Sequence, residues 1–295
     1  MSRFDLSLPL PPDYRRQDVF TFHGRDAEGL AERIEGQAIR KGVTIDGVPA
    51  VLGIDLGAQP DRALCTVDVD GAALPEQAQG MLLNVLGLRI APEPFEAAVA
   101  DDPLFAPLVA RARGLRVIQS ATVFEALSWA IIGQQINLGF AIALRRTFIA
   151  LAGRVHSSGL TCYPEAQDAA RLELDQLTSR KFSRAKAETL LRLARLVADG
   201  ELDLRRDASL PEVSERLLAV KGIGPWTVNY ALLRGYGFAD CSLEGDVAVR
   251  TAIGRLRGTA ERPDLAEAAA FLENYRPHRT LAAAHLWASL SQTAD

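Results

Sequence analysis

The chain has 295 residues, of which 48% are hydrophobic and 24% charged, the composition of an ordinary globular protein with room for two domains. It contains no apolar run near the roughly 20 residues that cross a bilayer. Its start lacks the apolar core and the small-residue cleavage site of a secretory signal. These features predict a cytoplasmic protein with no membrane partner.

Charge is unevenly distributed along the sequence. The net charge of −4 by itself argues mildly against a nucleic-acid partner. Residues 1–112, however, carry 10 Lys and Arg against 17 Asp and Glu, whereas residues 113–295 carry 23 against 20. This asymmetry is modest, and it indicates that any polyanion meets the second part of the chain.

The three cysteines, Cys65, Cys162 and Cys241, lie far apart in the sequence. This spacing does not suit a zinc ribbon or a clustered iron–sulfur site, and an odd number does not suit a disulfide framework. We therefore interpret them as buried thiols in a reducing compartment.

Residues 1–112 are predicted to form a small α+β domain. The stretches 43–57 and 62–71 alternate apolar and polar residues, as half-buried antiparallel strands do. Between Phe20 and Lys41 the segment EGLAERIEGQAIR has helical spacing, and a second helix is expected around residues 75–88. Four prolines between residues 91 and 108 make this stretch the best candidate for a domain boundary.

Residues 113–295 are predicted to be mostly α-helical. Residues 122–153 contain one or two long helices, interrupted near Gly133 or at 137–139, and residues 183–200 form an amphipathic helix that ends on Gly200. Two more helices are expected at 265–275 and 278–290. The predicted fold class is therefore α+β, with a small antiparallel sheet and its helices followed by a helical domain.

The most informative segment is LPEVSERLLAVKGIGPWTVNYALLRGYG, residues 210–237. Two short helices are predicted, joined by a tight turn in which Gly222 and Gly224 can each take a positive φ. Pro225 opens the second helix, where a missing N–H costs nothing. Such a hairpin presents several backbone N–H groups that bind a phosphate regardless of base sequence. Taken alone, the two glycines are more often a plain helical corner and Lys221 a solvated charge.

The motif LxxVKGIGPWTVNYALLRG is followed, twenty residues after Trp226, by an aspartate at the start of a new helix. Together with AIIGQQINL (130–138), RPHRTLAAAHLW (276–287) and a β-rich first domain, it resembles the helix-hairpin-helix–GPD superfamily of DNA glycosylases. The resemblance is closest to the bacterial 3-methyladenine DNA glycosylase II branch. It covers the last 180 residues or so, and for the first domain it is one of layout only. It implies hydrolytic removal of alkylated purines from duplex DNA by base flipping, in base excision repair.

Asp246 is the candidate catalytic residue. It is predicted to cap a helix, where the helix dipole and free N–H groups favour the ionised carboxylate. A lone aspartate in this position is usually only a cap, and Asp240 and Glu244 are close enough to compete for the role. Asp246 alone has the family's spacing from the hairpin. The resemblance implies that it stabilises the sugar cation that forms as the glycosidic bond breaks, and that it orients or deprotonates the attacking water.

Three residues are candidates for the base pocket. Trp226 and Tyr230 are four residues apart on the second hairpin helix, so they share a face. Core aromatics have the same spacing, but the resemblance favours a pocket wall, where a cationic base gains cation–π attraction. His278 stands where close relatives have a second tryptophan. It could stack on or hydrogen-bond to the base, or lie on the surface beside Arg276 and Arg279.

The resemblance also implies contacts with the DNA. Gln135, the residue after Gly-Gln in the IIGQ turn, would fill the space left by the flipped base, where some relatives have leucine. A polar pair at a helix end is an equally good interpretation of Gln134 and Gln135. Lys221, Gly222 and Gly224 would contact the backbone. Arg180, Lys181, Arg184 and Lys186 form a basic cluster that could meet phosphate, although such runs are usually a solvated face.

No cofactor is expected to be required. The family's hairpin holds a monovalent cation through three backbone carbonyls, which here would be those of Leu218, Val220 and Ile223, so a structural Na⁺ or K⁺ is a further expectation.

Water is the expected nucleophile. Family members that also cut the strand use a lysine two residues after the second hairpin glycine, and Trp226 stands at that position here. The sequence therefore predicts a monofunctional enzyme. We further expect it to be a monomer and to be associated with the nucleoid. Two alternatives stay open: a bifunctional glycosylase/lyase acting on oxidised bases, and a non-catalytic protein that only grips duplex DNA.

Overall fold

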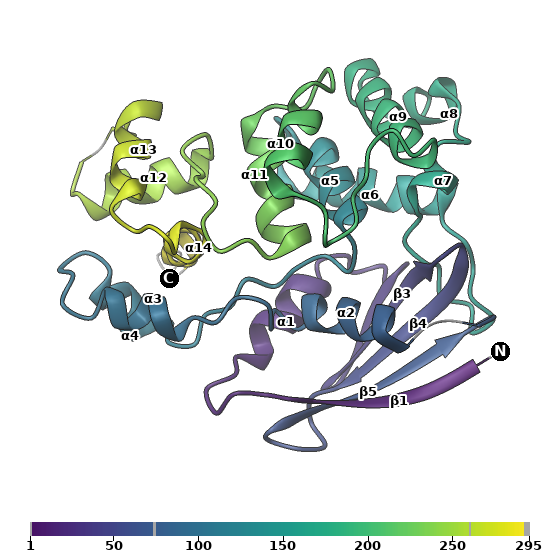
Figure 1. Cartoon of the computed structure of the whole chain (residues 1–295), viewed down its shortest axis with the longest axis horizontal. Helices are drawn as coiled ribbons and strands as arrows, with labels where there is room; N and C mark the ends of the chain where they lie inside the picture. Colours follow the sequence, from purple (N-terminus) through teal and green to yellow (C-terminus); the bar gives the residue numbers. More distant parts are fainter. Residues whose placement is uncertain (1, 73–74, 260, 292–295) are drawn as a thin grey trace.

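The computed structural model describes residues 2–72, 75–259 and 261–291. A five-stranded antiparallel sheet lies at one end of the molecule, and helices cover it and extend away from it (Figure 1). The predicted α+β class is confirmed. Among the helices within the described residues, none is both long and apolar enough to cross a membrane.

The sheet has the strand order β1-β5-β4-β3-β2, and every neighbouring pair is antiparallel. Its strands are β1 (Ser2–Pro9), β2 (Glu32–Glu35), β3 (Ala38–Ile45), β4 (Val48–Asp55) and β5 (Arg62–Val69). The predicted strand 43–57 is in fact the end of β3, a turn at Asp46–Gly47 and β4. The predicted strand 62–71 is confirmed as β5.

One helix prediction in this region is wrong. The segment EGLAERIEGQAIR does not form a helix, because its second half folds into the β2–β3 hairpin around Gly36, with Ile34 opposite Ile39. Its apolar residues suit both a helix face and a strand face, and pairing with β4 favours the strand. The helix of this region lies earlier, as α1 (Arg16–His23).

The helices divide between two hydrophobic cores. Helices α1 and α2 (Pro75–Val85) pack with the sheet, with Val19 and Leu82 fully buried. Helices α3 (Glu93–Ala98) and α4 (Ala106–Arg111) instead share a core with the later helices, and α4 contacts α14 (Arg279–Ser291). The domain boundary at residue 112 stays a prediction, and the packing groups residues 93–111 with the helical part.

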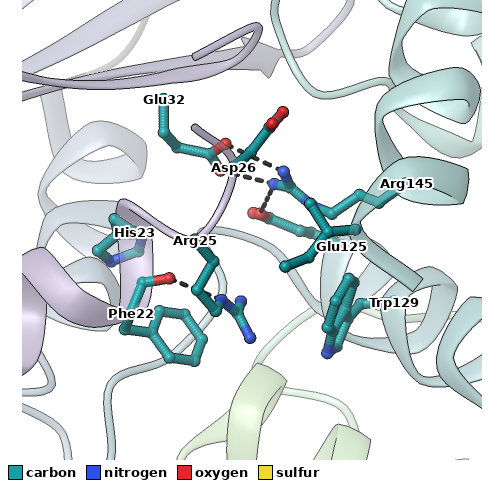
Figure 2. A pocket seen from close by; sticks show the side chains of 9 residues that line it. Phe22, His23, Arg25, Asp26, Glu32, Glu125, Trp129 and Arg145 are labelled. Carbon is teal, nitrogen blue, oxygen red and sulfur yellow. Dashed lines mark hydrogen bonds and ion pairs between the residues drawn. The ribbon is translucent and has the colours of Figure 1, made fainter. Parts of the chain in front are cut away.

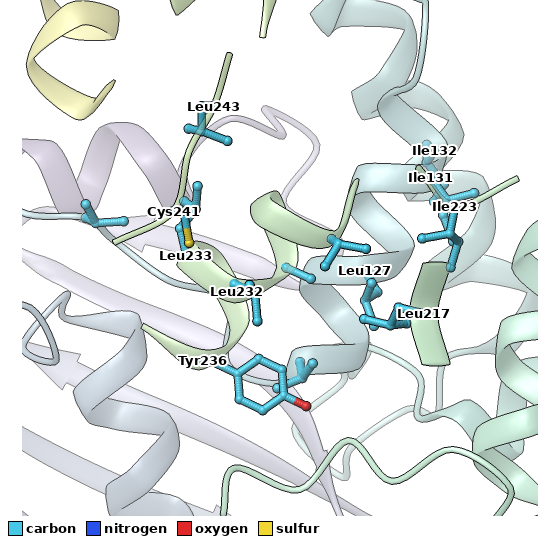
Figure 3. Close-up of a cluster of buried hydrophobic side chains, with 14 of the residues drawn as sticks. Leu127, Ile131, Ile132, Leu217, Ile223, Leu232, Leu233, Tyr236, Cys241 and Leu243 are labelled. Atoms are coloured by element: carbon cyan, nitrogen blue, oxygen red, sulfur yellow. The ribbon is translucent and has the colours of Figure 1, made fainter. Parts of the chain in front are cut away.

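The remaining helices form the rest of the molecule. They are α5 (Val123–Gly133), α6 (Leu138–Ala152), α7 (Ala166–Ala169), α8 (Leu174–Thr178), α9 (Arg184–Ala198), α10 (Leu210–Leu218), α11 (Pro225–Ala231), the π-helix η1 (Leu232–Tyr236), α12 (Val247–Leu256) and α13 (Leu265–Glu273). The predicted interruption within 122–153 is confirmed at residues 134–137. Helix α5 is buried from Val123 to Ile132, and Figure 3 shows Leu127, Ile131 and Ile132 of this helix beside Leu217 and Ile223.

A buried cluster of four charges joins the sheet to the helices. Lys41 of β3 donates to Glu32 at 2.6 Å and to Glu125 of α5 at 2.7 Å. Arg145 of α6 donates to the same two carboxylates, at 2.6 and 3.1 Å (Figure 2). Two positive and two negative groups balance, so each buried charge has its partners. The cluster fixes where α5 begins relative to the sheet.

Two buried histidines make the stability of the fold depend on pH. Burial lowers the pKa of His23 to about 3 and that of His285 to about 4. A histidine with a depressed folded-state pKa stabilises the fold above its unfolded pKa of about 6.5, and this stabilisation is lost as pH falls below that value. At pH 5 the loss is about 2 kcal/mol for each group. We expect the midpoint temperature of thermal unfolding to decrease as the pH is lowered from 7.5 to 5. His285→Phe should make this decrease smaller. An equal fall in wild type and variant would contradict this assignment.

Candidate active site

A cleft of about 740 Å³ brings three distant segments of the chain together. These segments are the turn between α5 and α6, the start of α11 and the start of α12. The cleft is lined by Gly133, Gln134, Gln135, Ile136, Asn137, Gly224, Pro225, Trp226, Thr227, Gly245, Asp246, Val247 and Ala248. Four predicted site residues, Gln135, Gly224, Trp226 and Asp246, therefore face one cavity.

Asp246 is half-buried and caps α12, as predicted, with its Oδ1 accepting the Val249 N–H at 2.9 Å. Two indoles reach the same carboxylate. Trp226 donates its Nε1–H to Oδ2 at 2.9 Å, and Trp287 of α14 donates its Nε1–H to Oδ1 at 3.1 Å. The carboxylate is thus held in one orientation by donors from three helices.

The other two candidate carboxylates lie elsewhere. Asp240 accepts from Arg279 at 2.7 Å and from Arg276 at 3.2 Å, so its largely buried carboxylate is used in ion pairs. Glu244 does not line the cleft. The geometry therefore agrees with the spacing argument that favoured Asp246.

Trp226 and Tyr230 pack together as an aromatic wall, of which Trp226 lines the cleft, whereas Tyr230 is buried outside the cleft lining. Their ring centroids lie 5.3 Å apart with an interplanar angle of 34°, so the predicted shared face is present. They pack in a small separate apolar cluster with Trp129 and Ile136. The hydrogen bond from Trp226 Nε1 to Asp246 fixes one edge of the indole. It thereby sets the orientation of the ring beside the carboxylate.

Two arginines lie behind this wall. The Arg25 guanidinium stacks 4.1 Å from the Phe22 ring centroid and 4.8 Å from that of Trp129 (Figure 2). The Arg234 guanidinium lies 4.8 Å from the Phe22 centroid and 5.5 Å from that of Trp287. Burial lowers the pKa of both groups. Phe22 and Arg25 bring the first domain against the back of the site.

The hairpin turn has one strained glycine and one ordinary one. Gly222 has φ of +98°, and a Cβ there would lie 2.0 Å from Thr189 Oγ1. Gly224 is extended, with φ of −111° and ψ of 177°, and a Cβ there would meet nothing within 4 Å. The prediction of positive φ is therefore right for Gly222 and wrong for Gly224, which caps α11 in the β conformation.

The hairpin is held in place through its own carbonyls. Gln134 donates from Nε2 to the Gly222 carbonyl at 3.1 Å and to Thr227 Oγ1 at 3.0 Å. The Lys221 carbonyl accepts from Thr189 at 3.2 Å and from Arg192 at 3.1 Å. The side chain of Lys221 is exposed, as the predicted contact with a DNA backbone requires.

The two glutamines of the IIGQQ turn have different surroundings. Gln134 is bound to the hairpin, whereas Gln135 is exposed, with a positive φ of 56°, and lines the cleft. Lys186 donates to the carbonyls of Ile132, at 3.0 Å, and of Gln134, and burial lowers its pKa. Lys186 therefore caps the end of α5 rather than standing free in a basic cluster.

A match to a family model links this geometry to known proteins. Residues 128–277, about half of the chain, match the HhH-GPD superfamily base excision DNA repair protein family. The chain belongs to this superfamily. The matched region contains the α5–α6 turn, the hairpin and Asp246, which are the three parts of the cleft.

The length of the region that this HhH-GPD chain shares with a relative differs from one relative to the next. DNA-3-methyladenine glycosylase of Bacillus subtilis is 32% identical over 199 residues, which is 66% of this chain and 66% of that protein. The probable bifunctional transcriptional activator/DNA repair enzyme AlkA of Mycobacterium tuberculosis is 26% identical over 294 residues, 98% of this chain and 58% of that protein. The chain thus spans less than two thirds of the length of each of these relatives. The solved 3-methyladenine DNA-glycosylase from Archaeoglobus fulgidus has the same fold, with a TM-score of 0.82 at 22% identity and coverage of 98% and 99%.

The structure does not bring His278 to the cleft of this HhH-GPD chain. Its ring faces Phe95 of α3, with centroids 6.3 Å apart, and its backbone N–H donates to the Tyr275 carbonyl at 2.7 Å. The tryptophan that approaches Asp246 from this part of the chain is Trp287, nine residues later. The motif RPHRTLAAAHLW contains both residues, and the sequence does not tell which of them faces the site.

A monovalent cation at the hairpin carbonyls stays a prediction. The carbonyl of Val220 accepts the Ile223 N–H at 3.0 Å, which leaves its second lone pair for a cation. The carbonyls of Lys221 and Gly222 accept hydrogen bonds from side chains. The ligands that the family resemblance implies are the carbonyls of Leu218, Val220 and Ile223. A bound Na⁺ or K⁺ would add positive charge where a phosphate is expected.

Proposed function

We propose that this chain is a monofunctional DNA N-glycosylase that removes alkylated purines from duplex DNA by base flipping and hydrolysis. The observation that carries the proposal is the convergence of Gln135, the hairpin and Asp246 on one cleft. A carboxylate, an aromatic wall and a backbone-binding turn within one cavity are the parts that base excision needs.

In the proposed reaction, Asp246 faces the sugar of the flipped nucleotide. As the glycosidic bond breaks, positive charge grows on the sugar, and the carboxylate stabilises it. The same carboxylate orients the attacking water and receives its proton. An alkylated purine already carries positive charge and leaves readily, so one carboxylate suffices. The base would stack on Trp226, while Gln135 would occupy its former place in the duplex.

Duplex DNA is the proposed partner, held by its backbone. The N–H groups at the start of α11, near Gly224, and the exposed ammonium of Lys221 are suited to phosphate oxygens. A Na⁺ or K⁺ on the neighbouring carbonyls would strengthen the same contact. No other cofactor is part of the proposal, and we propose that the protein acts as a monomer in the cytoplasm, on the nucleoid.

The positions of the amines favour water as the nucleophile. The sequence has four lysines, and none of them lines the cleft. Lys41 is used in the buried charge cluster and Lys186 in capping α5. Lys181 and Lys221 are exposed outside the cleft lining. A Schiff base with the sugar, which a bifunctional enzyme forms, has no suitable donor among these residues.

Two relatives support the choice of substrate. The Bacillus subtilis protein described above and the Escherichia coli protein, 28% identical over 176 residues, are both named as 3-methyladenine glycosylases. A protein that only binds DNA would not need a carboxylate fixed by three donors inside the cleft. We therefore favour an enzyme over the non-catalytic alternative.

Asp246→Asn tests the catalytic assignment. Asparagine keeps the helix cap and the size of the side chain, but it removes the negative charge that faces the sugar cation and turns an NH₂ group toward the Trp226 N–H. We expect single-turnover excision to fall by at least about 100-fold, while the affinity for a duplex with an abasic-site analogue is largely kept. Glu244→Gln, two residues earlier and outside the cleft, is the matched control. Near-normal turnover by Asp246→Asn would remove Asp246 from the mechanism.

Two alanine variants test the hairpin. Gly224→Ala adds a methyl group in open space on the side where a phosphate would approach, so we expect normal thermal stability and roughly tenfold weaker binding to damaged and undamaged duplexes. Gly222→Ala meets Thr189 and a positive φ, so we expect a stability loss of about 1–3 kcal/mol. If Gly224→Ala lost only lesion preference, the hairpin would not be the part that holds the backbone.

A further inference from the structure

Trp287 makes an unexpected contact with the proposed catalytic residue. Its indole comes from α14, forty-one residues after Asp246, and donates to Oδ1 at 3.1 Å. Trp226 donates to the other oxygen from α11. The carboxylate is therefore clamped between two indole edges that belong to different parts of the fold.

The two carboxylate oxygens are not equivalent. Oδ1 accepts two hydrogen bonds, from the Val249 N–H at 2.9 Å and from Trp287. Oδ2 accepts one, from Trp226. A carboxylate oxygen has two lone pairs, so Oδ1 is fully used and Oδ2 keeps one free. The free acceptor is on the oxygen that lies next to the aromatic wall.

Arg234 holds the ring of Trp287. Its guanidinium lies 5.5 Å from the Trp287 centroid, within the range of a cation–π contact, and 4.8 Å from that of Phe22. It also donates to the Ile118 carbonyl, while its buried Nε has no hydrogen-bond partner in the described structure. Arg234 lies in the π-helix η1, a form that often marks functional sites. Trp226, Tyr230 and Arg234 are spaced four residues apart. The Arg234 guanidinium therefore follows the two aromatic rings of the wall.

We propose that Trp287 is a positioning residue for Asp246, held by Arg234, and that it occupies Oδ1 so that Oδ2 alone acts on the sugar and water. The inference rests on the proposed function, in which Asp246 is the catalytic carboxylate. Trp287 acts through Asp246 and not through the base. Its loss should therefore slow every excision equally and leave DNA binding unchanged.

The test uses Trp287→Phe, which keeps an aromatic ring over Arg234 but removes the N–H donor. Single-turnover excision is measured on duplexes with N7-methylguanine and with N3-methyladenine, two alkylated purines of different shape, beside affinity for an abasic-site analogue. We expect about 10- to 100-fold slower excision of both bases and unchanged affinity. Ser289→Ala, two residues later in α14, is the control and should keep the wild-type rate.

Unchanged rates would overturn the proposal. So would weakened binding or a loss confined to one base, because these would place Trp287 in the wall that contacts the base. If Trp287→Phe does not fold, Arg234→Met provides the same test, with a smaller loss of rate expected on both bases at constant affinity. Asp246→Asn is measured in parallel. Its normal turnover would defeat the proposed function, whereas an inactive Asp246→Asn with a fully active Trp287→Phe would defeat this inference alone.

Discussion

The hydrogen bonds at the two ends of helix α5 are the interactions on which the site depends. At its start, Glu125 enters the buried charge cluster with Lys41 and Arg145, which joins the helix to the sheet. At its end, Lys186 caps the last carbonyls and Gln134 donates to the hairpin. Because the helix between is buried, it cannot shift without disturbing both ends. The first domain therefore helps to fix the distance between the Gln135 turn and the hairpin.

The cleft needs a third element, and Asp246 supplies it. The residue both caps α12 and accepts two indole N–H groups from other helices. A cap that served only its own helix would need one hydrogen bond to the backbone. The additional donors connect α12 to α11 and α14, so one side chain orders the place where three helices meet. This is the arrangement expected for a group that must hold its position while charge develops beside it.

Much of the site could be predicted from local sequence. The hairpin, the α5–α6 interruption and the N-cap at Asp246 each depend on a few neighbouring residues, such as Pro225 after Gly224. The fold class followed from the change of periodicity along the chain. These features are set by backbone preferences that a single sequence displays.

Other features depend on contacts between distant residues, and the sequence hides them. Ile34 and Ile39 suit a helix or a strand until a neighbouring strand is present. Lys186 looks like a surface charge until α5 ends beside it. His278 and Trp287 share one motif, and only the direction of α14 decides which of them reaches Asp246. The charge cluster likewise joins residues 113 positions apart, Glu32 and Arg145.

Identification of the reaction product distinguishes hydrolytic base excision from strand cleavage and from binding alone. Duplex DNA carrying labelled methyl groups would be incubated with the protein, with and without borohydride, and the released material identified by mass spectrometry. We expect free methylated purine, a strand that breaks only after alkali or heat, and no protein–DNA adduct. Binding without release of a base, or a trapped adduct with strand cleavage, would contradict it.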